Sequence, residues 1–383
     1  MLSPGRTVLF AACAIGLIAA VSAVQLQGER VSARPVPRAP DPVAPSAKAV
    51  DRAVKRGLQW LASNQSSSGC WTGATGHKRS DGYVVFYDQS WQDKHGRGHP
   101  GVTSLAGLAF LASGHLPGRG PYSETLDRTI DYVLDRTGHS AYMTDSGSRM
   151  YSHSFAVLFL SQVHGMTRRR SSEVESKLRE ACRFVIEAQN EYGAWRYTPG
   201  MLQADLSVTV CQVQALRAAR NVGIRVPKAC IDRVIDYVKR SRISHGRSAG
   251  AFFYKIYGRS ARTKTSFTVN AAAATCLHSA GVFDRGLNGP ALSYLEDHYD
   301  EVSAYYPGHY FYWYGNYYAV QALQMEGGKR WDRYWAKLSR DLVRRQRLDG
   351  SWENSVGPGD HFSTAMACLI LRAPLGYLPV FRH

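Results

Sequence analysis

Acidic residues are scarce in this chain. Its 383 residues include 47 Lys and Arg but only 30 Asp and Glu, which gives a formal net charge of +17. Charged residues make up 20% of the chain and apolar residues 44%, a balance that excludes a disordered protein. The basic residues are dispersed, which is not typical of a nucleic-acid-binding surface, so we expect no nucleic acid as a partner. An anionic envelope polymer is the expected partner; the alternative is an ordinary solvated basic coat.

Several chemical signatures are also missing. The sequence has no CxxC pair of a metal knuckle and no glycine-rich phosphate loop with a lysine. We therefore expect no metal and no cofactor. The six cysteines that follow residue 23 show no paired spacing and are expected to be buried free thiols. Their even number is also compatible with disulfides in an oxidising compartment.

The N-terminal residues have the pattern of a secretory leader. Arg6 precedes an apolar run over residues 8–21, and Val21-Ser22-Ala23 is a small-residue cleavage site. We expect residues 1–23 to be a signal peptide, residues 24–49 a Pro- and Ala-rich linker, and the protein to be exported to the periplasm or outside the cell. The alternative is an uncleaved anchor over residues 7–24, which is the only case in which we expect a membrane partner.

A short motif occurs three times in the remaining sequence. Each copy has the form Gln-x3-Gly-x-Trp and closes a segment rich in Lys and Arg. The copies are Gln65/Gly69/Trp71, Gln189/Gly193/Trp195 and Gln346/Gly350/Trp352. Their spacing fits repeated helical units of roughly 50–60 residues. In each copy Gln is expected to bind loose helix carbonyls, Gly to permit a tight reversal, and Trp to pack over a neighbouring outer helix.

Six pairs of helices are predicted from residue 50 onward. The first member of each pair is charged and amphipathic, which indicates an outer helix: residues 50–64, 123–136, 173–190, 227–242, 290–302 and 330–347. The second member carries almost no charge, which indicates a buried inner helix: residues 102–113, 152–163, 207–221, 266–280, 316–325 and 363–372. We therefore predict an all-α (α/α)6 toroid over residues 50–383, with its function in a central cavity where the inner helices begin.

The motifs and helix pairs resemble the prenyltransferase and squalene-oxidase repeat family over about residues 50–373. That family includes terpenoid cyclases and protein prenyltransferase β subunits. The resemblance implies an α/α toroid that binds an isoprenoid or other apolar molecule. It also implies a possible helical partner subunit, because protein prenyltransferases have one. The chain is long enough for one toroid, whereas triterpene cyclases resemble two.

The start of the third inner helix carries the family's acid position. Squalene-hopene-type cyclases open this helix with Asp-x-Asp-Asp-Thr, and Asp205 matches the middle Asp, so it is the candidate catalytic acid. Gln203 and Leu206 replace the other two carboxylates. Zinc prenyltransferases have Asp-x-Cys here and a later ligand His; Ser207 replaces their thiolate and His361 matches their His, so zinc is not expected. A purely structural alternative for Asp205 is a helix N-cap.

Other polar and aromatic residues are predicted near the cavity. Residues 305–318 are dense in aromatic rings, which can line a chamber, stack on sugars or simply pack between helices. Histidines and aspartates also precede several inner helices, among them Asp93, His95 and His99. The predicted cavity residues are His153, Ser207, Tyr312, Trp313, Tyr317, Asp360 and His361.

Three functions remain open from the sequence. The first is a toroid that binds an apolar or isoprenoid molecule, without the full cyclase or zinc chemistry. The second is a polysaccharide-active (α/α)6 barrel, in which Asp205 and a second carboxylate such as Asp360 would face each other across a cleft at roughly 5–10 Å. The third is a cyclase-like enzyme with Asp205 as the acid. The sequence does not decide whether the protein is an enzyme.

Overall fold

The computed structural model describes residues 43–74, 76–79, 82–85, 98–137, 141–144, 148–258 and 261–381. The predicted leader, most of the predicted linker, Asp93 and His95 lie outside these residues. Among the described helices, none combines the length and apolar character needed to span a bilayer.

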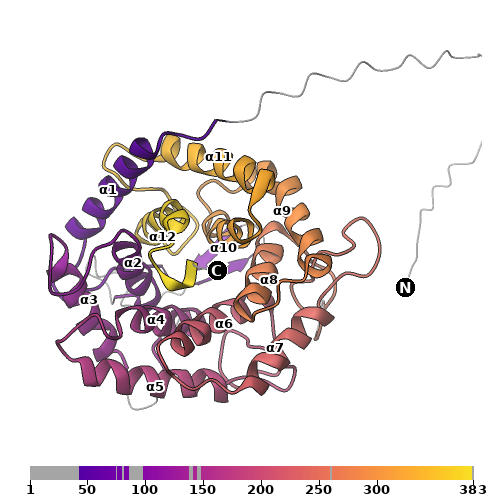
Figure 1. Ribbon diagram of the computed structural model, residues 1–383, viewed down its shortest axis with the longest axis horizontal. Helices are drawn as coiled ribbons and strands as arrows, with labels where there is room; N and C mark the ends of the chain where they lie inside the picture. Colours follow the sequence, from indigo (N-terminus) through magenta and orange to yellow (C-terminus); the bar gives the residue numbers. More distant parts are fainter. Residues whose placement is uncertain are drawn as a thin grey trace, which may run out of the picture. The chain divides into compact units, whose positions relative to one another are not determined.

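Twelve α-helices of the described part form two concentric rings (Figure 1). The outer helices are α1 (Ala47–Ser63), α3 (Ser123–Asp135), α5 (Ser171–Glu187), α7 (Lys228–Arg240), α9 (Arg285–Tyr305) and α11 (Gly328–Arg345). The inner helices are α2 (Pro100–Ala112), α4 (Arg149–Val163), α6 (Leu206–Asn221), α8 (Phe267–Ser279), α10 (Tyr310–Glu326) and α12 (Asp360–Arg372). Each inner helix contacts the next, and α12 returns to α2. The predicted (α/α)6 toroid is confirmed.

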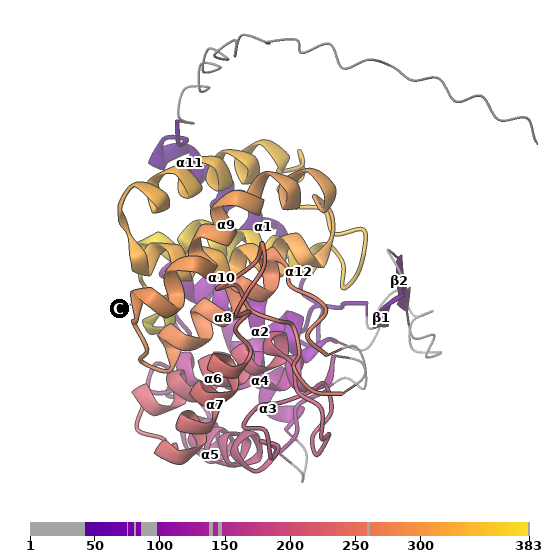
Figure 2. The same ribbon diagram turned by 90° about the vertical axis from the view of Figure 1, so that its right-hand side faces the viewer.

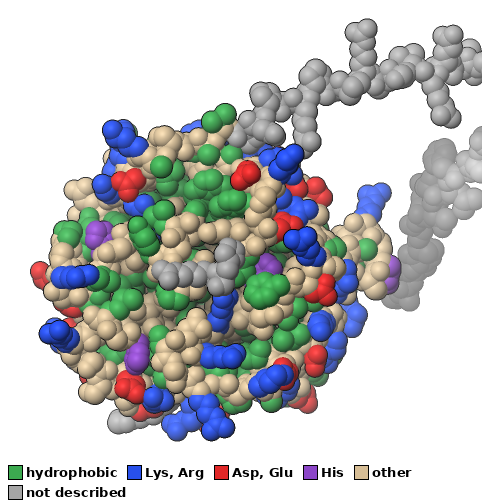
Figure 3. Space-filling model, viewed as in Figure 1, with side chains coloured by type: hydrophobic (Ala, Val, Ile, Leu, Met, Phe, Trp, Pro, Cys, Tyr) green, Lys and Arg blue, Asp and Glu red, His purple; other side chains and the backbone are tan. Residues whose placement is uncertain are grey.

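Burial follows the charge pattern of the sequence. Every residue of α2 is buried, because it packs against helices on all sides. In contrast, α7 buries only one stripe, at Cys230, Val234, Tyr237 and Val238. Figure 3 shows Lys and Arg side chains spread around the rim of the face seen in Figure 1, with apolar side chains between them. The six described cysteines are free and buried.

One small β-hairpin interrupts the helical pattern between α1 and α2. Strands β1 (Gly76–Arg79) and β2 (Gly82–Val85) are antiparallel, with Gly76 opposite Val85. The hairpin can be seen beside the helical rings in Figure 2. It was not predicted, because its strands are only four residues long.

The three motif copies join consecutive outer helices end to start. Gln189 Nε2 donates to Gly193 O of its own turn (3.0 Å) and to Cys230 O at the start of α7 (2.9 Å). Gln65 makes the same bridge to Thr125 of α3, and Gln346 to Ala53 of α1. The third copy therefore closes the ring onto its first helix. We call these three contacts the repeat joints.

Glycine has its expected role at the repeat joints, and tryptophan bonds to the outer helix that it follows and to an inner helix. Gly193 has φ +84°, and a Cβ there would lie 2.4 Å from the carbonyl oxygen of Arg233 in α7. Trp195 is buried, and its Nε1 donates to Val185 O of α5 at 2.8 Å. Its backbone N–H donates to Thr209 Oγ1 of α6 at 3.3 Å, so the turn is tied to both rings. The other two copies repeat both tryptophan bonds, to a carbonyl ten residues earlier and to a threonine of the following inner helix.

The other three outer joints have different chemistry. Arg170 pairs with Asp131 and Asp135 to hold α5 against α3. Glu296 of α9 pairs with Arg330 and Arg333 of α11. We call these two contacts the ion-pair joints.

The joint between α7 and α9 depends on a proline. Pro290 cannot donate to the carbonyl of Gly286 one turn earlier, and Arg242 Nη2 donates to that oxygen instead, at 3.0 Å. The predicted start of this helix at Pro290 is therefore wrong. The helix begins at Arg285, five residues before the predicted start, and Asp284 caps it through the N–H groups of Gly286 and Leu287.

The fifth inner helix also begins earlier than predicted, at Tyr310 rather than Asn316. His309 is its N-cap, with Nδ1 accepting from Phe311 N at 3.0 Å. Most of the aromatic residues of the 305–318 stretch therefore lie in the first turns of α10. Their rings fill the space between the inner helices, which accounts for the aromatic density of the segment.

The hole of the inner ring is bridged at two levels by α6 and α10. Cys211 Sγ lies 2.9 Å from Tyr314 OH and 3.2 Å from Tyr318 OH. Further along both helices, Gln214 Nε2 donates to Gln321 Oε1 at 2.6 Å. The C-terminal 3-10 helices Ala373–Leu375 and Pro379–Phe381 contact α6, α10 and α12 and lie inside the ring (Figure 1).

Candidate functional site

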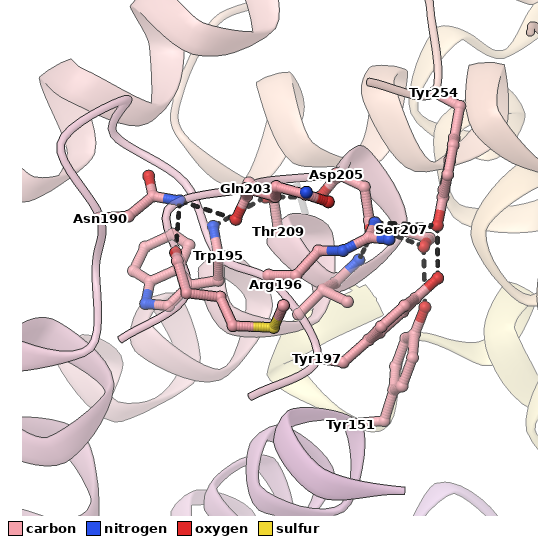
Figure 4. A network of polar contacts seen from close by, with 12 residues as sticks. Tyr151, Asn190, Trp195, Arg196, Tyr197, Gln203, Asp205, Ser207, Thr209 and Tyr254 are labelled. Atoms are coloured by element: carbon pink, nitrogen blue, oxygen red, sulfur yellow. Dashed lines mark hydrogen bonds and ion pairs between the residues drawn. The ribbon is translucent and has the colours of Figure 1, made fainter. Parts of the chain in front are cut away.

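The inner helices α2, α4 and α6 begin close together at one end of the hole. The N–H of Gly101 donates to Ser152 Oγ at 3.2 Å, and Tyr151 OH lies 2.7 Å from Ser207 Oγ. The loop before α6 and the chain before α8 bring further polar groups to the same place (Figure 4). We call this group the mouth and define it by Tyr151, Arg196, Tyr197, Asp205, Ser207 and Tyr254.

Asp205 is the buried centre of the mouth. It is fully buried and is the N-cap of α6, as the structural alternative predicted, with Oδ1 accepting from Val208 N at 2.9 Å. Its other oxygen, Oδ2, accepts from Arg196 Nη1. Two neutral hydroxyls complete its shell: Ser207 Oγ donates to Oδ1 at 2.6 Å and Tyr254 OH to Oδ2 at 3.1 Å. Four donors therefore fix this carboxylate.

Two further tyrosines extend this shell toward the surface. Because Ser207 donates to Asp205, the hydroxyl of Tyr151 donates to Ser207 Oγ. By the same reasoning Tyr197 OH donates to Tyr254 OH. At the outer end of each hydrogen-bond chain, the tyrosine hydroxyl donates its proton toward Asp205. Its oxygen lone pairs can then accept from a donor outside the chain. The side chains of Tyr151 and Tyr197 are each partly exposed.

Burial and the negative charge of Asp205 raise the pKa values of the tyrosines in the mouth. Burial, followed by the negative charge of Asp205, raises the pKa of Tyr151 well above its ordinary value. The same two causes, in the same order, raise the pKa of Tyr197 and of Tyr254. All three hydroxyls therefore stay protonated at neutral pH and can act as hydrogen-bond groups.

Arg196 is the cation of the mouth. Its guanidinium lies 4.2 Å from the centre of the Tyr197 ring, and 13% of its side chain is exposed. A guanidinium stacked on an aromatic ring is held in one orientation. The arrangement presents a fixed donor and two tyrosine acceptors to an incoming polar molecule.

A loop beside the mouth is held by one side chain. Asn190 Nδ2 donates to the carbonyl of Gln203 at 2.9 Å, and Asn190 Oδ1 accepts from Tyr192 N at 3.1 Å (Figure 4). Leu202 in this loop is 68% exposed. The loop therefore places an exposed apolar side chain next to the polar mouth.

The structure separates the other predicted site residues. His153 faces the outer ring, because its Nδ1 accepts from Met143 N and its Nε2 donates to Ala181 O of α5, both at 3.2 Å. Tyr312 is buried under Arg345, whose guanidinium lies 5.0 Å from its ring centre. Trp313 Nε1 donates to Glu353 O at 3.1 Å.

The remaining predicted residues also lie apart from Asp205. Tyr317 is buried in the hole, where it contacts the ring of Phe381. Asp360 pairs with Arg347 at 2.6 Å. His361 Nδ1 donates to Thr72 O at 3.0 Å, and burial lowers its pKa. Of the predicted set, the mouth brings together only Asp205 and Ser207.

The sequence analysis missed four residues of the mouth, namely Tyr151, Arg196, Tyr197 and Tyr254. A usable signal exists for two of them, because the motif tryptophan is followed by Arg-Tyr only in the second copy; Thr-Gly and Glu-Asn follow in the others. The other two reach the mouth from elements distant in sequence. Among the described residues, no group of three or more His, Cys, Asp or Glu is placed to hold a metal ion.

Comparison with known proteins identifies the fold. No family model and no curated protein matches the sequence. Similar solved structures include an α-1,6-mannanase from Salegentibacter sp., with 8% identity over 86% of this chain and 100% of that chain and a TM-score of 0.58. A cellobiose 2-epimerase from Bacillus thermoamylovorans has 11% identity over 85% and 99%, with a TM-score of 0.56.

A type II terpene cyclase from Scytonema is also similar, with 13% identity over 87% of this chain and 100% of that chain and a TM-score of 0.52. These neighbours are α/α toroid enzymes, and the chain has their fold. At such low identities the likeness concerns the fold alone.

Proposed function

We propose that the mouth binds a carbohydrate chain. The observation that carries this proposal is the polar character of the mouth: Tyr151, Arg196 and Tyr197 present half-buried acceptors, a donor and aromatic faces, while the hole beneath is bridged. Sugars offer hydroxyls for the polar groups and C–H faces for the rings. A long apolar molecule would need a chamber below the mouth, where the cross-ring bonds of Cys211 and Gln214 lie.

The structural neighbours support the same choice. Most of the named ones act on sugars: the mannanase, which is also described in complex with α-1,6-mannotriose, an α-amylase, and the epimerase. This chain shares their ring, and its polar groups gather at inner-helix starts. Whether the bound sugar is also cleaved depends on a second carboxylate. Asp360 is held by Arg347, so binding is the part of this function that the mouth supports best.

A binding assay tests the proposal. Purified protein is titrated with manno-, gluco- and galacturono-oligosaccharides in a calorimeter, and Tyr197→Ala is compared with Tyr294→Ala. Tyr294 is a half-buried tyrosine that stacks on His298 of the outer ring and serves as the matched control. We expect binding that Tyr197→Ala weakens by about tenfold or more and Tyr294→Ala leaves unchanged. Failure of every sugar to bind, or equal losses in both variants, contradicts the proposal.

An apolar or isoprenoid ligand is the second candidate. The terpene cyclase neighbour, the resemblance of the repeats and the aromatic rings around Tyr317 favour it. In its catalytic version Asp205 is the acid, and Asp205→Asn should abolish turnover. Mass spectrometry of molecules that copurify with the protein separates the candidates. A lipid lost in the double variant Tyr312→Ala, Trp313→Ala would favour this one.

Neither candidate depends on where the protein is located or on a partner. Export, a helical partner subunit and an anionic envelope polymer remain proposals from the sequence. Fractionation of the producing cell, with detection of the N-terminus of the mature chain, tests export: a new N-terminus near residue 24 is expected. An intact N-terminus in the membrane fraction would favour the anchor over residues 7–24.

A further inference from the structure

The chain that forms one side of the mouth contains no acidic residue over a long stretch. From residue 237 to residue 283 there is no Asp or Glu. The same stretch contains Lys239, Arg240, Arg242, Arg247, Lys255, Arg259, Arg262 and Lys264. Such an imbalance leaves an excess of positive charge along this stretch.

Part of this stretch is bound directly to the mouth. Tyr254 donates through its hydroxyl to Asp205, and its carbonyl accepts from Leu206 N at 3.1 Å. From Tyr254 the chain turns away and comes back: Tyr254 N donates to Lys264 O at 2.8 Å, and Arg262 N donates to Lys255 O at 2.9 Å. Residues 254–258 and 261–264 are therefore the two sides of a narrow excursion whose base is fixed at the mouth.

The basic side chains of this excursion are available to bind an anionic ligand. Arg262 and Lys264 are exposed and Lys255 is half-buried, and none of the three forms an ion pair with a described residue. The only carboxylate of the mouth, Asp205, is already occupied by Arg196. The positive charge of the excursion therefore faces solvent without a counterion from the mouth.

A second cation lies on the other side of the mouth. Arg149 is half-buried at the first residue of α4, next to Met150, whose N–H donates to Tyr197 O at 3.1 Å. Its backbone has φ 54°, a left-handed conformation that residues other than glycine seldom adopt and that often marks a functional position. Arg149 forms no ion pair with a described residue, so its charge is also free for a ligand.

We infer that the carbohydrate bound at the mouth is an acidic glycan, whose carboxylate or sulfate groups are held by Arg149 on one side and by Lys255 and Arg262 on the other. This inference rests on the proposed carbohydrate binding. The tyrosines and Arg196 hold the sugar, and the outer cations select its charge. An acidic chain that spans both sides gains two charge-assisted contacts that a neutral chain cannot make.

Paired probes that differ only in charge test this inference. Polygalacturonate is compared with its full methyl ester, and dextran sulfate with dextran, by affinity electrophoresis and calorimetry at two salt concentrations. The variants are Arg149→Gln and the double variant Lys255→Gln, Arg262→Gln. The control is the double variant Arg168→Gln, Arg225→Gln, which removes two exposed cations elsewhere on the ring. Glutamine removes the charge and leaves a shorter, polar, unbranched side chain.

We expect an acidic probe to bind more tightly than its neutral partner, with an affinity that falls as salt rises. Arg149→Gln and the Lys255/Arg262 double variant should each weaken that binding about tenfold, as expected for loss of a charge-assisted contact, while the control stays within about twofold. Preference for polygalacturonate over dextran sulfate would assign the carboxylate as the recognised group, and the reverse would assign the sulfate.

Two results would overturn the inference in different ways. If a neutral glycan binds as well as its acidic partner and Tyr197→Ala abolishes the binding, the mouth is a sugar site without charge selection. If the control variant loses as much affinity as the mouth variants, the positive charge acts as a diffuse coat. Failure of all glycans to bind would instead remove the proposed function on which this inference depends.

Discussion

The repeat joints and the ion-pair joints hold the same kind of helices together by different chemistry. At a repeat joint, such as Gln189 with Cys230, a neutral amide satisfies backbone carbonyls beside a buried tryptophan. At an ion-pair joint, such as Glu296 with Arg330, both side chains are about one quarter to one third exposed. The first kind is insensitive to salt and needs one residue type at each position. The second kind tolerates exchange of residues and responds to salt and pH.

The difference explains which joints can be found in a sequence. A repeat joint needs Gly at one position because a Cβ would strike the backbone of the next helix, so the motif is visible three times. An ion-pair joint needs only opposite charges on facing helices, and Asp131 with Arg170 or Glu296 with Arg333 leaves no pattern along the chain. Half of the outer joints were therefore predictable, and half were not.

The largest expected effect is at the joint that closes the ring. Trp352→Ala removes a buried indole and its bond to Leu342 O, and should lower the free energy of unfolding by about 3–5 kcal/mol. Denaturant unfolding followed by circular dichroism measures the change. Trp331→Ala is the control, since Trp331 is only partly buried where it stacks on Trp335 of the outer ring. If both variants lost the same free energy of unfolding, the repeat joints would not contribute more to stability than other tryptophan contacts.

The contact between α4 and α5 is expected to lose stability at acidic pH, because it contains the buried His153. Burial lowers the pKa of His153 to about 4 from an ordinary value of 6.5. The unfolded chain therefore binds a proton between these values that the folded chain does not, and stability is lost as pH falls from 6.5 toward 4, by about 3 kcal/mol. His153→Phe should have a flatter stability profile over this range. The exposed His245→Phe should keep the slope of the wild type, and a wild-type slope in both would contradict the prediction.

The free-energy cost of replacing glycine at a repeat joint has two contributions, backbone strain and the close approach of the next helix. Gly193 and Gly200 both have positive φ, but a Cβ at Gly200 meets nothing within 4 Å, whereas at Gly193 it meets the backbone of α7. Gly200→Ala should cost about 1 kcal/mol from backbone strain alone, and Gly193→Ala about 2–3 kcal/mol because the helices must also shift. Thermal unfolding of the two variants provides the difference. Similar melting temperatures would mean that the close approach is not important.

The smallest effect is expected at an ion-pair joint. Burial works to raise the pKa of Glu296, but hydrogen bonds and charges from Arg333 and Arg330 outweigh it and lower the pKa. The pair is therefore fully stabilising above the ordinary carboxyl value of 4.5 and is lost as pH falls through the lowered value. At neutral pH Glu296→Gln should cost less than about 1 kcal/mol, since the pair is partly exposed, and high salt should abolish the cost. Gln346→Ala, at a repeat joint, should cost the same at low and high salt.

The mouth was less predictable than the ring. Asp205 was found because it lies at the start of an inner helix, and its N-cap role follows from that position alone. Tyr151 and Tyr254 lie 54 and 49 residues away in the sequence, and the packing of neighbouring inner helices brings them to the mouth. Helical periodicity fixes which face of α6 points inward, but not which loop residues cover its first turn. The resemblance likewise directed attention to the aromatic residues of α10, most of which are packed in the core.

The bond from Gln346 to α1 has a consequence for how the chain is made. Helix α1 leaves the ribosome first, yet the turn that completes its surroundings is synthesised almost three hundred residues later. Until then its exposed stripe has no cover, so a nascent or truncated chain is open to misassociation. An open solenoid can stop after any repeat and add a cap, but a closed circle is finished only when its last unit meets its first.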